Sequence, residues 1–583
     1  MKRRLLPILM TLVLVCALPI WAAFVTSGDV TNPLVCTAWA DTAEGERNSG
    51  TTQETFTEVT DETTLKKAVA DGKSVRMTQD ITLTSSLYIE KAVTLDMDGH
   101  MLTRMHTDKY DMVVIRSDAT LTLIDSNTGN LQHRFNAGET GWTKAADNAT
   151  GDGIVTVTGG VIYGDAGSSI DTCGIKILDG KLEMYGGNIV GIGNGYTHAY
   201  GGGVYVSDKC TFNMYGGSIK GCYVWSDGGG VYVAENGTFT MSGSSAITNC
   251  KGSRGGAVYN AGTFTMRDNS HIADCIYISS IAGGGGVHNK GTFNVEGGSI
   301  TGSVNDHNRE QSSDDICIEG TLNAGITIAC NVNVVDGGTI SKGTFTGRVW
   351  IYSEGTILDG TFTNEVINYE GRIKAGEFTG KIENSYGKID GGTFRGSVTS
   401  SGYNAIISDG NFHGTVTNES GATISGGTFD KNVTNKTYAT LNGGIFYGGV
   451  TNDGGKIEDG AYETVKFNSD NGAQAKEEKV LRGQKVAKPT DDPTKSGYTF
   501  TGWEDANGAG AYDFNTPVTA PLTLTAKWEK NPSSGGYYYY PTTDTKTDDT
   551  KGSPKTADPG AALYGALALL SLTGMVALNG KKR

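Results

Sequence analysis

The strongest constraint on the fold is a short repeat in the second half of the chain, where three apolar columns recur with a period of about 17 residues. Isoleucine or leucine stands five positions before each phenylalanine of the repeat, and valine or isoleucine stands four positions after it. The phenylalanines are Phe345, Phe362, Phe378, Phe394, Phe412, Phe429 and Phe446. Columns that stay in phase over seven repeats predict a parallel β-solenoid, because stacked turns place like residues above like residues.

A longer repeat precedes it, between residues 186 and 300. Its glycine-rich motif occurs at Gly201–Tyr205, Gly228–Tyr232, Gly255–Tyr259 and Gly284–His288. Its apolar columns are Phe212, Phe239, Phe264 and Phe293, and Ile219, Ile247, Ile272 and Ile300. Three short strands in a period of about 27 residues predict one turn of a three-faced parallel β-helix.

These repeats predict an all-β protein, with the three-faced helix over residues 75–335 and a narrower solenoid over residues 336–464. Roughly 15–18 turns at about 4.8 Å each predict a rod of about 75–85 Å. Residues 41–74 are a lead-in that ends in a predicted helix over Asp61–Gly72, with Asp61 or Thr63 as its N-cap. This helix would cover the open end of the solenoid. Residues 131–153 lack the strand alternation, and we predict a loop there.

The composition narrows the classes of function. Glycine makes up 85 of 583 residues without the three-residue period of collagen, so it indicates frequent tight turns. The nine cysteines lack the spacing of a disulfide framework. A formal net charge of −15 argues against nucleic acid as a partner and disfavours acidic polysaccharides.

Few residues suggest chemistry. Asp208, Asp227, Arg254 and Asp274 fall near turn corners but share no column, and we interpret them as scattered charges on a solvated face. Cys222, Cys250 and Cys275 share one register, which predicts a ladder of buried sulfur atoms or an oxidised pair. His198, His271 and His288 form no set of metal ligands. The sequence therefore predicts no catalytic residue, no cofactor and no metal site.

Two regions in the body of the chain resemble known families. The Gly-Gly-Gly-Val-Tyr and Gly-Thr-Phe-Thr-Met motifs resemble the pectate-lyase-like, right-handed β-helices of bacterial surface proteins. Residues 465–530 resemble the internalin B-repeat, also called the Listeria–Bacteroides repeat, in three segments. The segments are Lys466–Gly472, Pro493–Trp503 and Tyr512–Trp528. The second resemblance implies a small β-grasp-like module that serves mainly as a spacer or in modest adhesion.

The two ends of the chain predict export and tethering. Lys2, Arg3 and Arg4 precede an apolar run, which is typical of a signal peptide over residues 1–40. Cleavage is possible near Ala22–Ala23 or after Ala40, and we favour Ala40 because acidic, polar sequence follows it. Residues 531–552 form a polar linker. Its Tyr537–Tyr540 run could stack on glycans, or it could be a linker segment that adheres non-specifically.

Residues 553–583 resemble a sortase sorting signal, with a pentapeptide, an apolar span over Ala561–Leu578 and a basic tail. The pentapeptide consists of Ser553, Pro554, Lys555, Thr556 and Ala557, with serine and alanine where the commonest motif has leucine and glycine. The resemblance implies cleavage after Thr556 by sortase and attachment to peptidoglycan at the surface of a Gram-positive cell. A plain C-terminal membrane-spanning anchor is the alternative.

The expected function is therefore that of a cell-surface adhesin or stalk, tethered to the cell wall, whose solenoid binds host or neighbour-cell glycans or proteins. The rival hypothesis is a wall-anchored polysaccharide lyase or hydrolase, which would need carboxylates gathered on one face of the β-helix. A third possibility is a spacer without a ligand.

Overall fold

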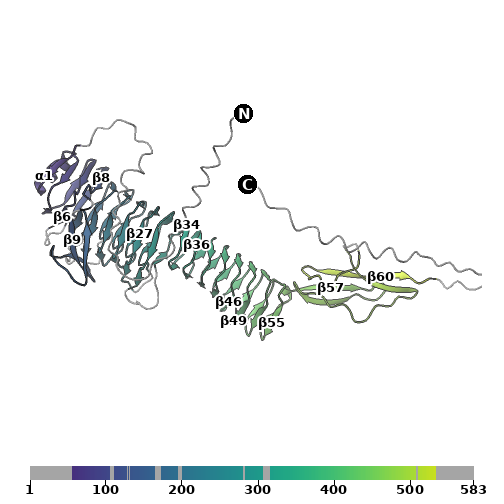
Figure 1. Cartoon of the computed structure of the whole chain (residues 1–583). Helices are drawn as coiled ribbons and strands as arrows, with labels where there is room; N and C mark the ends of the chain where they lie inside the picture. Colours follow the sequence, from purple (N-terminus) through teal and green to yellow (C-terminus); the bar gives the residue numbers. More distant parts are fainter. Residues whose placement is uncertain are drawn as a thin grey trace, which may run out of the picture.

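The computed structural model describes residues 55–532 except 105–109, 128, 130, 165–171, 195–199, 280–282, 306–314 and 507–509. The predicted signal peptide with Ala40 and the predicted sorting signal from Ser553 to Ala557 lie outside these residues. Within them, no helix has the length and apolarity that crossing a membrane would require. The described chain is almost entirely β-structure, in a long parallel solenoid followed by a small β-domain (Figure 1).

The first part of the solenoid has three main parallel sheets, as the longer repeat predicts. Sheet A begins with β1 (Thr57–Val59) and β2 (Val75–Met77), sheet B runs from β3 (Ile81–Leu83) to β31 (Ser299–Thr301), and sheet C starts at β4 (Leu87–Ile89). A short fourth sheet extends from β16 (Gly193–Asn194) to β32 (Val304–Asn305). We call this part the wide solenoid.

The phenylalanine column of the wide solenoid stacks in register inside sheet A. Its strands are β18 (Thr211–Met214), β22 (Thr238–Met241), β26 (Thr263–Met266) and β30 (Thr292–Val295). Successive ring centroids lie 4.7, 4.9 and 4.8 Å apart and the rings are nearly parallel. The spacing equals one turn because each ring is held at the same position of its strand.

The second part, the narrow solenoid, has a simpler turn. Sheet A contributes two strands per turn, for example β44 (Lys388–Ile389) and β45 (Thr393–Phe394), and sheet C contributes one, β46 (Val398–Ser401). Sheet A ends with β56 (Lys456–Ile457) and sheet C with β55 (Val450–Asp453). In the described residues beyond β31, no strand continues sheet B.

The three apolar columns of the short repeat and one polar ladder fill the narrow solenoid. The seven phenylalanines from Phe345 to Phe446 stack with centroids 4.7–5.2 Å apart. Beside them runs a polar ladder on the inner face of sheet C: Asn368, Asn384, Ser400, Asn418 and Asn435. Asn368 donates to Asn384 at 2.7 Å, and Asn384 donates to Ser400 at 3.1 Å. The amide N–H groups of the ladder thus find acceptors within the core.

Helix α1 (Glu62–Ala70) covers the first turn. Asp61 accepts a hydrogen bond from the Thr64 backbone at 2.8 Å and forms a capping box with it, so the N-cap is Asp61 and not Thr63. Leu65, Ala68 and Val69 are buried against the strands, and the chain leaves the helix at Gly72 with φ +77°. An amphipathic helix can close a solenoid end because its own backbone groups are already paired.

The prediction of a loop over residues 131–153 is wrong. Strands β9 (Gln132–Gly138), β10 (Gly141–Lys144) and β11 (Ile154–Thr158) form an antiparallel sheet. Its Phe135 and Trp142 are buried in a separate apolar cluster with residues of the solenoid. Its strands do not belong to a turn of the solenoid, so they carry none of the repeat columns by which strands were recognised in the sequence.

The C-terminal domain is a four-stranded mixed sheet in the order β58-β57-β60-β59. Its strands are β57 (Tyr462–Asn468), β58 (Lys476–Leu481), β59 (Tyr498–Asp505) and β60 (Leu522–Lys530). This module closes the far end of the solenoid, since the Phe446 N–H donates to the Arg482 carbonyl at 2.8 Å and Leu481 packs on the solenoid core. Figure 1 shows it continuing the rod beyond β55.

Candidate functional site

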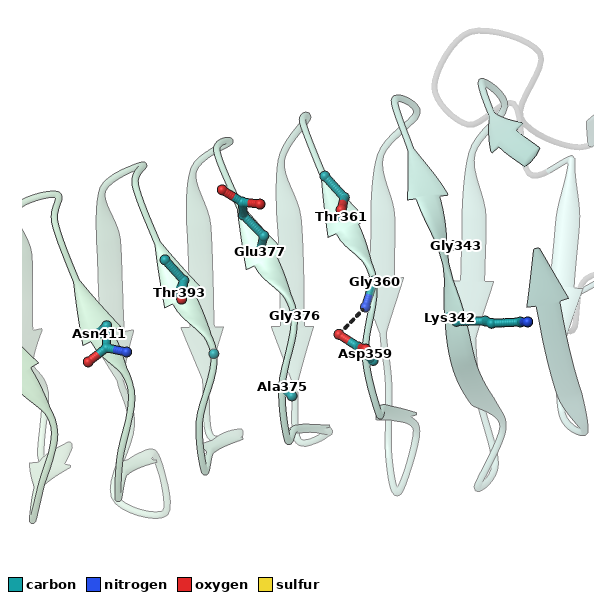
Figure 2. A pocket seen from close by; sticks show the side chains of 11 residues that line it. Lys342, Gly343, Asp359, Gly360, Thr361, Ala375, Gly376, Glu377, Thr393 and Asn411 are labelled. Carbon is teal, nitrogen blue, oxygen red and sulfur yellow. Dashed lines mark hydrogen bonds between the residues drawn. The ribbon is translucent and has the colours of Figure 1, made fainter. Parts of the chain in front are cut away.

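A groove about 540 Å³ in volume follows sheet A of the narrow solenoid (Figure 2). It runs along the bend between the two sheet A strands of each turn, from the turn of Lys342 to the turn of Asn411. Its floor consists of Gly343, Gly360, Gly376 and Gly392, one from each turn. We call it the glycine groove.

The floor is bare because no side chain fits there. Gly360, Gly376 and Gly392 have φ values of +139°, +125° and +113°, which L-residues with a side chain rarely adopt. A Cβ atom on Gly360 would lie 3.0 Å from the ring of Phe362, and one on Gly376 would lie 3.1 Å from the ring of Phe378. The phenylalanine stack therefore requires glycine at this bend, and the row of glycines leaves a channel along the outside.

Polar side chains line the groove on both sides. Thr361, Glu377, Thr393 and Asn411 stand at the same register of successive strands, each just before a phenylalanine. Lys342 and Asp359 come from the other side of the bend, as Figure 2 shows. Asp359 accepts from the Gly360 N–H at 2.8 Å, and Glu377 accepts from Arg395 Nε at 2.8 Å. The groove offers hydroxyl, amide, carboxylate and ammonium groups to a ligand.

This arrangement suits a flexible or extended polar ligand better than a metal ion. Among the described residues, no cluster of three or more His, Cys, Asp or Glu side chains has the geometry to hold a metal. The volume lies within the roughly 300–1,000 Å³ that is common for ligand sites. Sequence reasoning missed the groove, although the Gly before Thr-Phe in each short repeat was its signal.

Two of the four charged residues named from the sequence form an ion pair, and the other two stand apart from it. Asp208 and Asp274 are exposed on different turns. Asp227, in contrast, is 5 % exposed and receives two hydrogen bonds from Arg254, at 3.0 and 2.7 Å. Interpreting all four as solvated charges was therefore wrong for Asp227, which is buried because Arg254 neutralises it. The bond to Asp227 raises the pKa of Arg254.

The predicted sulfur ladder is present as thiols. Cys222, Cys250 and Cys275 are fully buried and unoxidised, and burial raises the pKa of Cys222 and Cys250 well above the usual range. His198 lies outside the described residues, whereas His271 is half-buried, which lowers its pKa. His288 Nε2 lies 2.8 Å from Glu319 Oε1 in a buried pair. These residues contribute to packing in the wide solenoid.

A stack of aromatic rings on the outer face of sheet C was also missed. Tyr205, Tyr232, Tyr259 and His288 lie one above another at 5.1, 5.1 and 5.3 Å. The tyrosine of the Gly-Gly-Gly-Val-Tyr motif was the available signal. Tyr259 is 6 % exposed beneath Arg254, and burial raises the pKa of Tyr232 to about 12. Tyr205 and Tyr232 are partly exposed but Tyr259 and His288 are buried, so the stack offers no continuous row of open rings to a ligand.

The described chain is a capped parallel β-solenoid that ends in a small β-domain. The family model of the Listeria-Bacteroides repeat domain matches residues 464–527, which confirms the prediction for this module. No curated protein and no solved structure gives a significant match to the chain.

Proposed function

We propose that the protein is an exported adhesin or stalk that is tethered to the cell wall and binds an extended glycan in the glycine groove. The observation that carries this proposal is the groove itself, which stays open over five successive turns and is lined by hydrogen-bonding side chains. One turn advances about 4.8 Å. A sugar unit in an extended chain advances by nearly the same length, so each unit could meet an equivalent set of groups.

The lining favours sugar hydroxyls over charged groups. Thr361, Thr393 and Asn411 can each donate and accept, and Glu377 accepts. The chain as a whole carries a formal charge of −15, so an acidic polysaccharide would be repelled. The preferred ligand is therefore an uncharged glycan of host or neighbouring cells.

Tethering completes the proposal. The expected signal peptide would direct export, and sortase would cut after Thr556 and join the chain to peptidoglycan. The Listeria-Bacteroides repeat module, at the end nearer that anchor, supports this orientation. Thr556→Ala tests it: the variant should leave the wall fraction and be recovered from the membrane or medium. Unchanged wall attachment would contradict the sortase step.

A second candidate function is hydrolysis of the bound glycan. Asp359 and Glu377 line the same groove from opposite sides, and glycosidases act through pairs of carboxylates. Arg395 Nε donates to Glu377 Oε1 at 2.8 Å, so one of the two carboxylates is already engaged by an arginine. This contact makes binding without turnover the better proposal.

The test measures binding and product release together. The full chain is titrated with uncharged xylan, mannan and β-glucan and with polygalacturonate, while reducing ends and unsaturated sugars are recorded. Glu377→Gln and Asp359→Asn should weaken binding of an uncharged glycan roughly tenfold. Glu383→Gln, a carboxylate of the same solenoid on sheet C, is the matched control and should bind normally.

Saturable binding without product supports the adhesin. Turnover that disappears in Asp359→Asn or Glu377→Gln would make the protein an enzyme. Equal binding by the groove variants and the control would exclude the groove as the glycan site.

A further inference from the structure

A row of tyrosines stands along one corner of the narrow solenoid, where sheet C ends and the next turn of sheet A begins. We call these residues the tyrosine strip: Tyr352, Tyr369, Tyr386, Tyr403 and Tyr438, which are 40, 44, 43, 79 and 78 % exposed. Five aromatic side chains of about 200 Å² each leave roughly 600 Å² open to solvent. Exposed patches of this size on a soluble surface usually mark an interaction site.

Two of these tyrosines occupy backbone conformations that do not suit them. Tyr386 and Tyr438 have φ values of +59° and +70°, in the left-handed region. A bulky residue there costs about 1–2 kcal/mol relative to glycine. Glu354, Glu370 and Ser420 occupy comparable turns at φ values of +63°, +64° and +55°. The turn therefore accepts small or polar residues, and neither backbone preference nor burial accounts for tyrosine.

The rings of Tyr386 and Tyr403 lie over the glycines of the following turn. A Cβ atom on Gly402 would fall 2.6 Å from the ring of Tyr386, and one on Gly421 would fall 2.5 Å from the ring of Tyr403. Tyr369 meets Tyr386 edge-on with centroids 5.8 Å apart. Each glycine thus supports one side of a ring and leaves the other side to solvent.

We propose that the tyrosine strip is a stacking platform for an uncharged, extended polysaccharide. The apolar C–H face of a pyranose ring covers an open aromatic face, and the tyrosine hydroxyls can bond to the sugar hydroxyls. Tyr369, Tyr386 and Tyr403 come from successive turns, so the platform is continuous along the axis. A chain can lie on it lengthwise, whereas a small molecule would touch only one ring.

The surroundings of the strip favour an uncharged chain. Glu354, Glu370 and Glu419 stand at the same corner, and Glu419 is paired with Lys436 at 2.7 Å. Carboxylates accept hydrogen bonds from sugar hydroxyls and repel anionic polymers. The strip is a single line of rings with at most one ring from each turn, whereas a protein partner needs a central cluster of buried anchoring residues.

This inference rests on the proposed function and adds a second contact surface to it. The strip and the glycine groove belong to the same turns but lie on different parts of them, separated by the first sheet A strand of each turn, such as β44. Variants can therefore remove one surface without touching the other.

The experiment uses the full chain and hydroxyethyl cellulose, xylan and mannan as probes, with polygalacturonate as the charged control. Tyr386→Asn with Tyr403→Ser removes two neighbouring rings, and the asparagine suits the left-handed turn. Affinity for at least one uncharged probe should fall roughly tenfold. Thermal stability should stay equal or rise, which a merely structural role for the rings would not produce. Tyr88→Ala, a tyrosine 46 % exposed on the wide solenoid, is the matched control.

The outcomes separate the two proposals. Loss of binding in the tyrosine variant but not in Tyr88→Ala supports the strip, whatever Glu377→Gln does. Normal binding by the tyrosine variant together with loss in Glu377→Gln would reject the strip and keep the groove. If no uncharged probe binds, or the strip captures a protein whose binding needs Tyr403, the glycan assignment is wrong.

Discussion

The wide and narrow solenoids share sheet A and sheet C, yet the outer face of sheet C differs between them. In the wide solenoid, outward positions such as Val114, Tyr259 and His288 are 4, 6 and 0 % exposed. In the narrow solenoid, the corresponding Ile367, Glu383 and Thr399 are partly exposed. This face is thus covered over the last turns of the wide solenoid and partly open in the narrow one, whereas Tyr205 and Tyr232, earlier in the wide solenoid, are partly exposed.

Turn length explains the difference. Each turn of the wide solenoid has about 27 residues, which is more than its three strands contain, and the remaining residues form loops. Charged groups such as Arg254 fold over the outer tyrosines there. Each turn of the narrow solenoid has about 17 residues, and its strands and corners take nearly all of them. A short turn therefore leaves its surface free for a ligand, which is why both proposed contact surfaces lie on the narrow solenoid.

The dependence of the narrow solenoid on its end cap should give the largest effect. Removing residues 462–532 exposes the backbone edge at Phe446, so the truncated chain should associate end to end or lose its cooperative unfolding transition. Light scattering and urea unfolding by circular dichroism measure this. Gly483→Ala should cause part of the effect, because its Cβ would lie 2.7 Å from the Phe446 nitrogen. Gly497→Ala controls for backbone strain, because Gly497 has a φ of +77° but open space around its Cβ position. A truncated chain that stays monomeric and equally stable would contradict the role of the module as an end cap.

Removing one core ring from each region tests whether the narrow solenoid depends more on its phenylalanine stack for stability than the wide solenoid does. Phe394→Ala and Phe239→Ala should each lower the free energy of unfolding by about 3–5 kcal/mol. The loss should be larger for Phe394, because a narrower interior has fewer side chains that can shift into the cavity. Urea denaturation of the two variants decides this. A greater loss for Phe239 would mean that the wide solenoid depends more on its rings.

Acidification tests the junction between the two regions. The contact with His288, aided by Lys290, outweighs burial and lowers the pKa of Glu319 to about 2. Its stabilising effect is complete above the ordinary pKa near 4.5 and is lost as the pH falls towards 2, by at most about 3 kcal/mol. Glu319→Gln should lower stability at pH 7 and flatten the acid limb of the stability curve. Glu296→Gln, in an exposed pair with Arg267, should change stability by less than about 1 kcal/mol.

The asparagine ladder should show the smallest effect. Ser400 interrupts it, so Asn418 Oδ1 lacks a hydrogen-bond partner among the described residues. Ser400→Asn should supply one and raise the free energy of unfolding by about 1 kcal/mol, whereas Asn384→Ala should lower it by about 1–3 kcal/mol. Chemical denaturation measures both changes. A destabilised Ser400→Asn would indicate that the serine is needed for space.

Much of the fold could be predicted because a solenoid repeats its own contacts. Each phenylalanine needs the same neighbour one turn away, so the requirement is written into the sequence at a fixed period. The antiparallel sheet of β9, β10 and β11 escaped prediction because it occurs once. The candidate site escaped as well, since a groove arises from side chains that are missing, such as those at Gly360 and Gly376.

The sequence by itself determined the stacking of the turns, the position of the capping helix and the C-terminal repeat module. Period and apolar pattern suffice for these, because they depend on burial along one axis. Only the tertiary structure decided which faces stay open. The tyrosines at 205, 232 and 259 and those at 369, 386 and 403 look alike in the sequence. In the first set Tyr259 is buried and the other two are partly covered, whereas the second set is exposed, because exposure depends on what the rest of each turn folds against.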